Sequence, residues 1–259
     1  MVGSIGDLEV DAMRVRVFDD VHTLGVAAAE HAAVVIGRAI ATAGVANVMF
    51  ASGNSQLEFL AALCARDDVD WARVVGFHMD EYLAMAADHP ASFRRYMHVH
   101  LADHVHPSAF HELRGDATDA DAECDRYAAL LRSQPLDLCC LGIGENGHLA
   151  FNDPPVADFE DPLDVKIVAL DDACRRQQVG EGHFATFGDV PSRALTVTVP
   201  ALLRAASVIA VAPEARKRDP VARALTGPIS TECPASILRS LGHVTLYLDA
   251  ESAHGMVPA

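Results

Sequence analysis

The chain has 259 residues, of which 51% are hydrophobic, and a formal net charge of −16 at pH 7. This length suits one α/β domain or two small ones, and the hydrophobic fraction is enough for a sizeable core. A chain this acidic is a poor general binder of nucleic acid or of anionic membranes, although a local group of amides and a cation can still bind a small anion.

The cysteines and the N-terminal segment favour a cytoplasmic location. The six cysteines form no CxxC pair, and Cys139 and Cys140 lie inside an apolar run, so we expect buried free thiols in a reducing compartment. The first fifteen residues lack the basic start and apolar centre of a secretory signal. No apolar segment approaches membrane-spanning length, and we expect no membrane partner.

Predicted strands and helices alternate along the chain. The expected strands are apolar or rich in β-branched residues, and they span 13–18, 47–52, 72–77, 136–144, 165–170, 193–199, 206–212 and 243–248. The expected helices lie between them, at 21–44, 55–66, 90–105, 119–133, 200–205, 214–225 and 234–240. This order predicts a single-domain α/β fold over residues 1–259, a Rossmann-like three-layer sandwich with a mainly parallel central sheet. Sites in such folds form beyond the carboxyl ends of the strands.

The first candidate site follows the strand at 47–52, in FASGNSQLEFLAAL. Gly53 permits a tight turn, while Ser52, Asn54 and Ser55 offer hydroxyl and amide groups. Free N–H groups at the start of a helix favour an anion such as phosphate. A plain helix cap by Asn54 or Ser55 explains the same pattern.

The second candidate lies in GFHMDEY, where Asp80, Glu81 and Tyr82 directly follow a strand. A partly desolvated carboxylate at a strand end can act as a general base. The alternative is a solvated acid in a turn.

The third candidate is LGIGENGHLAFNDP, which ends the most hydrophobic strand of the chain. His148 follows a glycine-rich turn, and an imidazole can carry a proton near neutral pH. Asn146 and Asp153 could orient the ring or adjust its charge. A histidine that caps a short helix is the simpler interpretation.

Lys217 is the fourth candidate, because it follows an expected strand and opens a helix. It is one of only two lysines, the other being Lys166, although a lone lysine is usually solvated.

A cluster of histidines at 97–113 suggests zinc, since His100 and His104 stand four residues apart on an expected helix. The HExxH pattern is absent there, which favours a surface or packing role over metal binding.

In order and spacing, the four candidate segments together resemble the glucosamine-6-phosphate deaminase/isomerase family, whose fold is shared with 6-phosphogluconolactonase. FHMDEYLAMAADHPASF resembles that family's FNMDEY…HPxSY segment, and LGIGENGHLAFNDP resembles its GxGxDGHxAFNEP segment. VPSRALTVTVPALLRA and KRDPVARALTGPIS resemble two further family segments, the second being the phosphate-lysine helix. The resemblance runs from about residue 14 to 253. The lactonase branch usually continues GHTASLFP after the glycine turn, so GHLAFNDP favours the deaminase branch.

The resemblance implies a phosphorylated amino sugar as substrate and no metal or organic cofactor. It implies that the phosphate is held by Ser52, Gly53, Asn54, Ser55 and Lys217. His148 would help to open the sugar ring, with Asn146 and Asp153 beside it. Asp80, next to Glu81, would take the proton from C2 of the open aldose, or from C1 of the ketose in reverse.

The chain departs from the family pattern around the sugar. Asn146 stands where the family has an aspartate, Asp153 replaces a glutamate, and Phe93 replaces a tyrosine. The segment 174–184 lacks the well-placed substrate arginine that typical members have. Sugar contacts are instead expected from Gly147, Gln178, Glu181 and His183.

These departures leave several functions open. A dehydratase that eliminates water from N-acetylglucosamine 6-phosphate would use the same enolisation, because amine loss is blocked when C2 carries an acetamido group. A 6-phosphogluconolactonase is less favoured. A sensor that binds a sugar phosphate without chemistry is the non-enzymatic alternative. The sequence leaves both a monomer and a homo-oligomer open.

Overall fold

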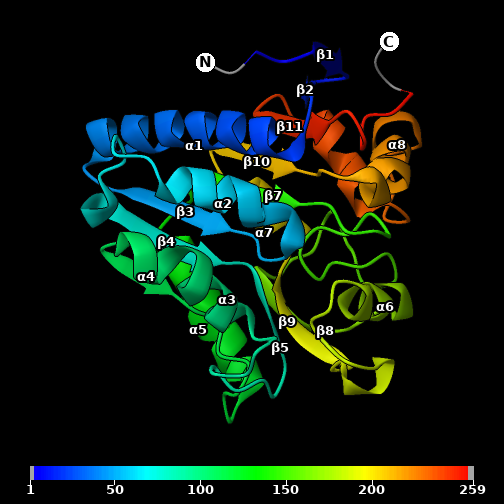
Figure 1. Cartoon of the computed structure of the whole chain (residues 1–259). Helices are drawn as coiled ribbons and strands as arrows, with labels where there is room; N and C mark the ends of the chain where they lie inside the picture. Colours follow the sequence, from blue (N-terminus) through cyan, green and yellow to red (C-terminus); the bar gives the residue numbers. More distant parts are fainter. Residues whose placement is uncertain (1–2, 256–259) are drawn as a thin grey trace.

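The computed structural model describes residues 3–255, and an eight-stranded sheet forms its framework (Figure 1). The strand order is β1-β2-β11-β10-β7-β3-β4-β6, and every pairing is parallel except that of β1 with β2. These strands are β1 (Gly6–Val10), β2 (Met13–Phe18), β3 (Ala46–Phe50), β4 (Val74–His78), β6 (Ala109–His111), β7 (Leu138–Gly142), β10 (Ser207–Val211) and β11 (Val244–Asp249). The expected α/β fold with a mainly parallel central sheet is confirmed.

A second, antiparallel sheet of three strands lies beside the first (Figure 1). Its order is β5-β9-β8, with β5 at Asp80–Tyr82, β8 at Val165–Ala169 and β9 at Arg193–Val197. The sequence predicts β8 and β9 as strands but not their separation from the central sheet. The amide of Val197 donates to the carbonyl of Met79, which joins this sheet to the end of β4.

Helices cover both faces of the central sheet, which gives three layers. The helices are α1 (Val21–Ala43), α2 (Leu57–Cys64), α3 (Phe93–Met97), α4 (Asp103–Val105), α5 (Ala120–Ser133), α6 (Asp172–Gly180), α7 (Val199–Leu203) and α8 (Arg218–Thr226). Buried residues of α1 and α2 pack with one face of the sheet, and those of α5, α7 and α8 pack with the other. The helix expected over 90–105 is interrupted by a π-helical turn at His98–Ala102.

Helix α1 corrects the expectation that no apolar segment reaches membrane-spanning length. It has 23 residues, and its most apolar 18-residue window has a mean hydropathy of 1.4. Alanines contribute much of this apolar character. Ala27, Ala28 and Ala32 are buried and allow the helix to lie close to the sheet. In this structure α1 is therefore a core helix of the sandwich (Figure 1).

Candidate active site

Polar residues that follow three neighbouring strands meet in one pocket. β7, β3 and β4 are adjacent and parallel, so their carboxyl ends lie at the same edge of the sheet. Residues after these strands line the pocket together with side chains from α6 and from the turn before α8. The polar lining consists of Ser52, Ser55, Asp80, His148, Gln177, Gln178, Glu181 and Lys217.

Asp80 presents a buried carboxylate to this pocket. Asp80 is the first residue of β5 and is only 6% exposed. Within residues 3–255 its carboxylate accepts no hydrogen bond, and the pKa of Asp80 is raised well above its usual value by burial and by the nearby charges of Glu81 and Asp153. An unbonded carboxylate with a raised pKa can accept a proton near neutral pH.

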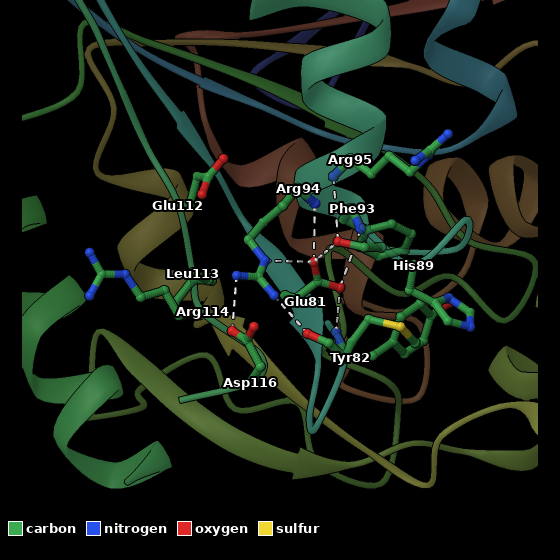
Figure 2. Close-up of polar contacts among 12 residues, drawn as sticks. Glu81, Tyr82, His89, Phe93, Arg94, Arg95, Glu112, Leu113, Arg114 and Asp116 are labelled. Atoms are coloured by element: carbon green, nitrogen blue, oxygen red, sulfur yellow. Dashed lines mark hydrogen bonds and ion pairs between the residues drawn. The ribbon is translucent and has the colours of Figure 1, made fainter. Parts of the chain in front are cut away.

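Glu81 does not reach the pocket, contrary to its expected place beside the base. Successive side chains of a strand point to opposite sides, so Glu81 points away from Asp80. It lies at the start of α3 (Figure 2). Its carboxylate accepts hydrogen bonds from Ser92 Oγ at 2.6 Å and from the amides of Phe93 and Arg94 at 3.2 and 3.0 Å. Arg94 Nε lies 3.5 Å from the same carboxylate. Glu81 therefore anchors α3 behind the site.

His148 forms a close pair with Asp153. Nδ1 of the imidazole lies 2.8 Å from Oδ1 of Asp153. Burial alone would raise the pKa of Asp153, but His148 and hydrogen bonds from Asn146 and Asp171 lower it, so the carboxylate stays charged. A charged Asp153 fixes the ring orientation and stabilises the imidazolium that forms when His148 takes a proton.

Asn146 is hydrogen-bonded to both members of this pair. Its Oδ1 accepts the backbone amide of His148 at 3.0 Å, and its Nδ2 donates to Asp153 at 2.9 Å and to Asp171 at 3.4 Å. Among the described residues, Asn146 makes no hydrogen bond to the imidazole ring itself. Asn146 and Asp153 therefore support His148 without lining the pocket.

The expected phosphate residues gather at one end of the pocket, with one exception. Ser52, Gly53 and Ser55 line it, and Gly53 has a φ of 108°, which favours glycine. Asn54 does not line it, because its Nδ2 donates to the carbonyl of Glu181 at 3.3 Å. Lys217 is only 2% exposed and lines the pocket. Within residues 3–255 its ammonium donates no hydrogen bond, so it is available to a ligand.

Of the four expected sugar residues, only Gln178 and Glu181 line the pocket. Gln178 accepts a hydrogen bond from Tyr82 Oη at 2.7 Å. Gly147 lies in the turn before His148, with a φ of 92°, and a side chain there would collide with Cys233. His183 Nε2 approaches Glu181 at 3.3 Å from outside the lining.

Two residues of the site have no signal in the sequence. Gln177 lines the pocket, accepting the amide of Glu145 at 2.9 Å and donating to Glu181 at 2.8 Å. Arg216 Nη1 lies 2.8 Å from the same carboxylate of Glu181. Both belong to polar segments without apolar periodicity, and only the three-dimensional position of α6 relates them.

One group of metal-ligating side chains converges within residues 3–255: His148, Asp153 and Cys174. Burial, together with the charges of Asp153 and Asp80, raises the pKa of the Cys174 thiol well above its usual value. His148 and Asp153 are already paired, so this donor set favours a hydrogen-bonded cluster over a thiolate metal site. In the histidine-rich segment, His98 pairs with Asp103 and Glu112, and His104 contacts the carbonyl of Val99.

A family model described as glucosamine-6-phosphate isomerases/6-phosphogluconolactonase matches residues 19–247. The chain belongs to this family. A glucosamine-6-phosphate deaminase of Listeria innocua is 35% identical over 215 residues, which cover 82% of this chain and 88% of the relative.

Solved structures of family members show the same fold. A monomeric glucosamine-6-phosphate deaminase, described as a missing link of its superfamily, superposes with a TM-score of 0.84 and 28% identity over 92% of this chain and 98% of its own. A 6-phosphogluconolactonase of Shewanella baltica has a TM-score of 0.76 at 20% identity, with 96% and 100% of the two chains covered. At that identity the second likeness concerns the fold alone.

Within this family member, the shorter acid at position 153 still reaches its partner. Asp153 replaces the longer glutamate expected from the family pattern, yet its carboxylate lies 2.8 Å from His148. The amide of Asn146 donates to the same oxygen of Asp153 at 2.9 Å. The two departures thus occur together, and the resulting pair is closely packed and buried.

Proposed function

We propose that this protein is a glucosamine-6-phosphate deaminase-like enzyme that removes the C2 proton of the open-chain substrate with Asp80. One arrangement carries this proposal: a buried, unbonded Asp80 carboxylate shares a pocket with the His148–Asp153 pair and with the free ammonium of Lys217. The named relatives at 35% identity support the substrate class.

In the proposed reaction, Lys217 and the Ser52–Ser55 turn hold the phosphate, and His148 carries the proton that opens the sugar ring. Asp80 then removes the C2 proton, the electron pair forms a C1–C2 double bond, and the C1 oxygen gains a proton. Asp80 returns its proton to C1 while a C2–nitrogen double bond forms. Water adds at C2, the C2–nitrogen bond breaks, and ammonia leaves with a ketose 6-phosphate as the other product. A single carboxylate placed over both carbons serves both transfers.

The cysteines fit the proposed cytoplasmic setting of this metabolism. All six are free thiols, and five of them are buried. Such thiols are typical of proteins in reducing compartments.

The test is to incubate the enzyme with glucosamine 6-phosphate and, separately, its N-acetyl form, and to measure ammonia release, water loss by mass and deuterium uptake at C2. We expect ammonia from the first substrate, with deuterium at C1 of the ketose product and at C2 of the recovered substrate. Asp80→Asn should lower turnover at least about 1,000-fold while inorganic phosphate binds as before. Binding without exchange would indicate a sensor, and water loss from the N-acetyl form would indicate a dehydratase.

The pH profile gives an independent check on Asp80. Asp80 acts as a base only when deprotonated, and burial followed by the charges of Glu81 and Asp153 raises its pKa. kcat/KM should therefore fall as the pH drops through this raised pKa, at a higher pH than for an exposed aspartate. An acid limb at the pKa of an ordinary aspartate would contradict the assignment.

A further inference from the structure

The carboxylate of Glu181 lies at the phosphate end of the pocket. Its Oε1 accepts hydrogen bonds from Arg216 Nη1 and Gln177 Nε2, both at 2.8 Å. Its Oε2 lies 3.3 Å from His183 Nε2 and 4.0 Å from the place where a side chain on Gly53 would begin. The group is 5% exposed. An anion already lies where the substrate's phosphate is expected.

The groups around Glu181 keep its carboxylate ionised. Burial alone would raise the pKa of Glu181, but His183, Lys217, Arg216 and Gln177 lower it to about 2. Glu181 is thus ionised at every physiological pH. Burial lowers the pKa of Lys217, and the negative charge of Glu181 opposes this lowering.

The pocket is also small while Glu181 is in place. Its volume is about 60 Å³, whereas pockets for small molecules usually hold roughly 300–1,000 Å³. Glu181 lies at the C-terminal end of α6, and its backbone carbonyl is bound by Asn54 of the phosphate turn. Glu181 therefore links the end of α6 to the opposite wall of this small pocket.

We propose that Glu181 substitutes for the substrate's phosphate in the empty enzyme, and that its displacement frees Arg216 as a second phosphate-binding cation. This inference rests on the proposed function only in taking the ligand to be a sugar phosphate. A phosphate dianion carries twice the charge of a carboxylate and has three oxygens for Lys217, Arg216 and the hydroxyls of the turn. Arginine suits this exchange because its planar fork binds carboxylate and phosphate equally well.

Displacement lowers the apparent affinity for phosphate. Only molecules in which Glu181 has left can bind, so the apparent Kd equals the intrinsic Kd divided by the fraction of such molecules. Replacing Glu181 with a neutral side chain should remove this competition. Replacing Arg216 in that background should remove a ligand of the phosphate.

The experiment compares Glu181→Gln with the wild-type enzyme in two assays. We expect the KM for glucosamine 6-phosphate to fall about tenfold with kcat within a factor of two, and the Kd of inorganic phosphate, measured by calorimetry, to fall in parallel. Glu214→Gln is the matched control, because Glu214 also pairs with Arg216, at 2.6 Å, but lies outside the pocket and is 44% exposed. The control should change neither value more than twofold.

Arg216→Met is then added to Glu181→Gln. The double variant should bind phosphate at least about tenfold more weakly than Glu181→Gln alone. An unchanged Kd would show that Arg216 only holds Glu181 in place. A higher KM and a higher Kd in Glu181→Gln would overturn the proposal, because Glu181 would then be a ligand of the substrate.

The two assays separate this proposal from the proposed function. Calorimetry with inorganic phosphate requires no turnover, so a tighter Kd in Glu181→Gln supports the displaced carboxylate even if ammonia is not released. A Kd unchanged by Glu181→Gln, in an enzyme that does release ammonia, refutes the displacement and leaves the deaminase assignment intact.

Discussion

Asn146 supports the His148–Asp153 pair through Asp153, where its hydrogen bond adds to the larger effect of His148 in lowering the pKa of the carboxyl group. Its two N–H groups point at Asp153 and Asp171, at 2.9 and 3.4 Å, and its oxygen accepts the backbone amide of His148. An aspartate at this position, as in the family pattern, would offer no donor to either carboxylate. The local partners of residue 146, and not its chemistry alone, decide which side chain suits the site.

Asn146→Asp should therefore damage this enzyme, although it restores the residue of the family pattern. The new carboxylate would lie beside Asp153 and Asp171, raise the pKa of Asp153 and remove a hydrogen bond that holds it. We expect kcat to fall about tenfold or more, measured by ammonia release with calorimetric phosphate affinity as the reference. A kcat equal to or above that of the wild type would show that the donors of Asn146 are dispensable.

Much of the site could be predicted residue by residue because its members follow strands. Asp80, His148 and Lys217 come after β4, β7 and β10, and adjacent parallel strands bring such residues together whatever their distance in sequence. Glu81 was assigned to the site because it follows Asp80. Its orientation depends on β5, a three-residue strand without a recognisable pattern. Arg216 has no comparable signal, since its role depends on where Glu181 lies.

At the scale of elements, Glu81 links β5, the strand that carries Asp80, to helix α3. The first amides of a helix have no partner within it, and a carboxylate there satisfies them and favours the helix dipole. Glu81 does this for Phe93 and Arg94 of α3, while Arg94 also pairs with Asp116 and donates to the carbonyl of Met85 (Figure 2). The residue next to the proposed base therefore stabilises the fold.

Glu81→Gln should act on stability. Arg94 is 4% exposed and would lose its buried counter-charge, so the free energy of unfolding should fall by about 3–5 kcal/mol. Urea denaturation measures this loss, and Glu58→Gln is the control, since Glu58 belongs to an exposed pair with His22 and should cost less than about 1 kcal/mol. A stable Glu81→Gln protein with abolished kcat would restore Glu81 to the chemistry.

The elements that the sequence predicted are those with an apolar signal. α1 extends from the capping Asp20 to Gly44, and β7 is a continuous buried run, so both are recognisable locally. β1, β5, β6 and α6 have no such signal. β5 and β6 have only three residues each, β1 carries two acids among its five residues, and α6 presents mostly polar side chains such as Gln177 and Gln178 on its buried side. Which strands pair with one another depends on residues far apart in the sequence. The placement of β8 and β9 in a second sheet therefore has no local signal.

At the scale of the whole molecule, the two sheets share one core. The largest cluster of buried side chains contains Leu195 and Val197 of β9 together with Leu141 of β7 and Leu246 of β11. The small sheet also carries a smaller cluster that includes Tyr82, Val168 and Ala194, but Leu195 and Val197 join it to the large core. We therefore propose that the small sheet and the large sheet unfold as a single unit, as expected for a one-domain chain.

Leu195→Ala tests whether the two sheets unfold together. Leu195 is fully buried, so the substitution should cost about 2–5 kcal/mol and lower the Tm by roughly 5–15 °C. If the sheets are one unit, calorimetry should show a single transition that moves as a whole, because the cavity lies in the core common to both. Leu163→Ala is the control, since Leu163 precedes β8 but is 52% exposed, and its Tm should stay within about 2 °C of the wild type. A split transition, in which only one part shifts with Leu195→Ala, would show that the small sheet is a separate cooperative unit.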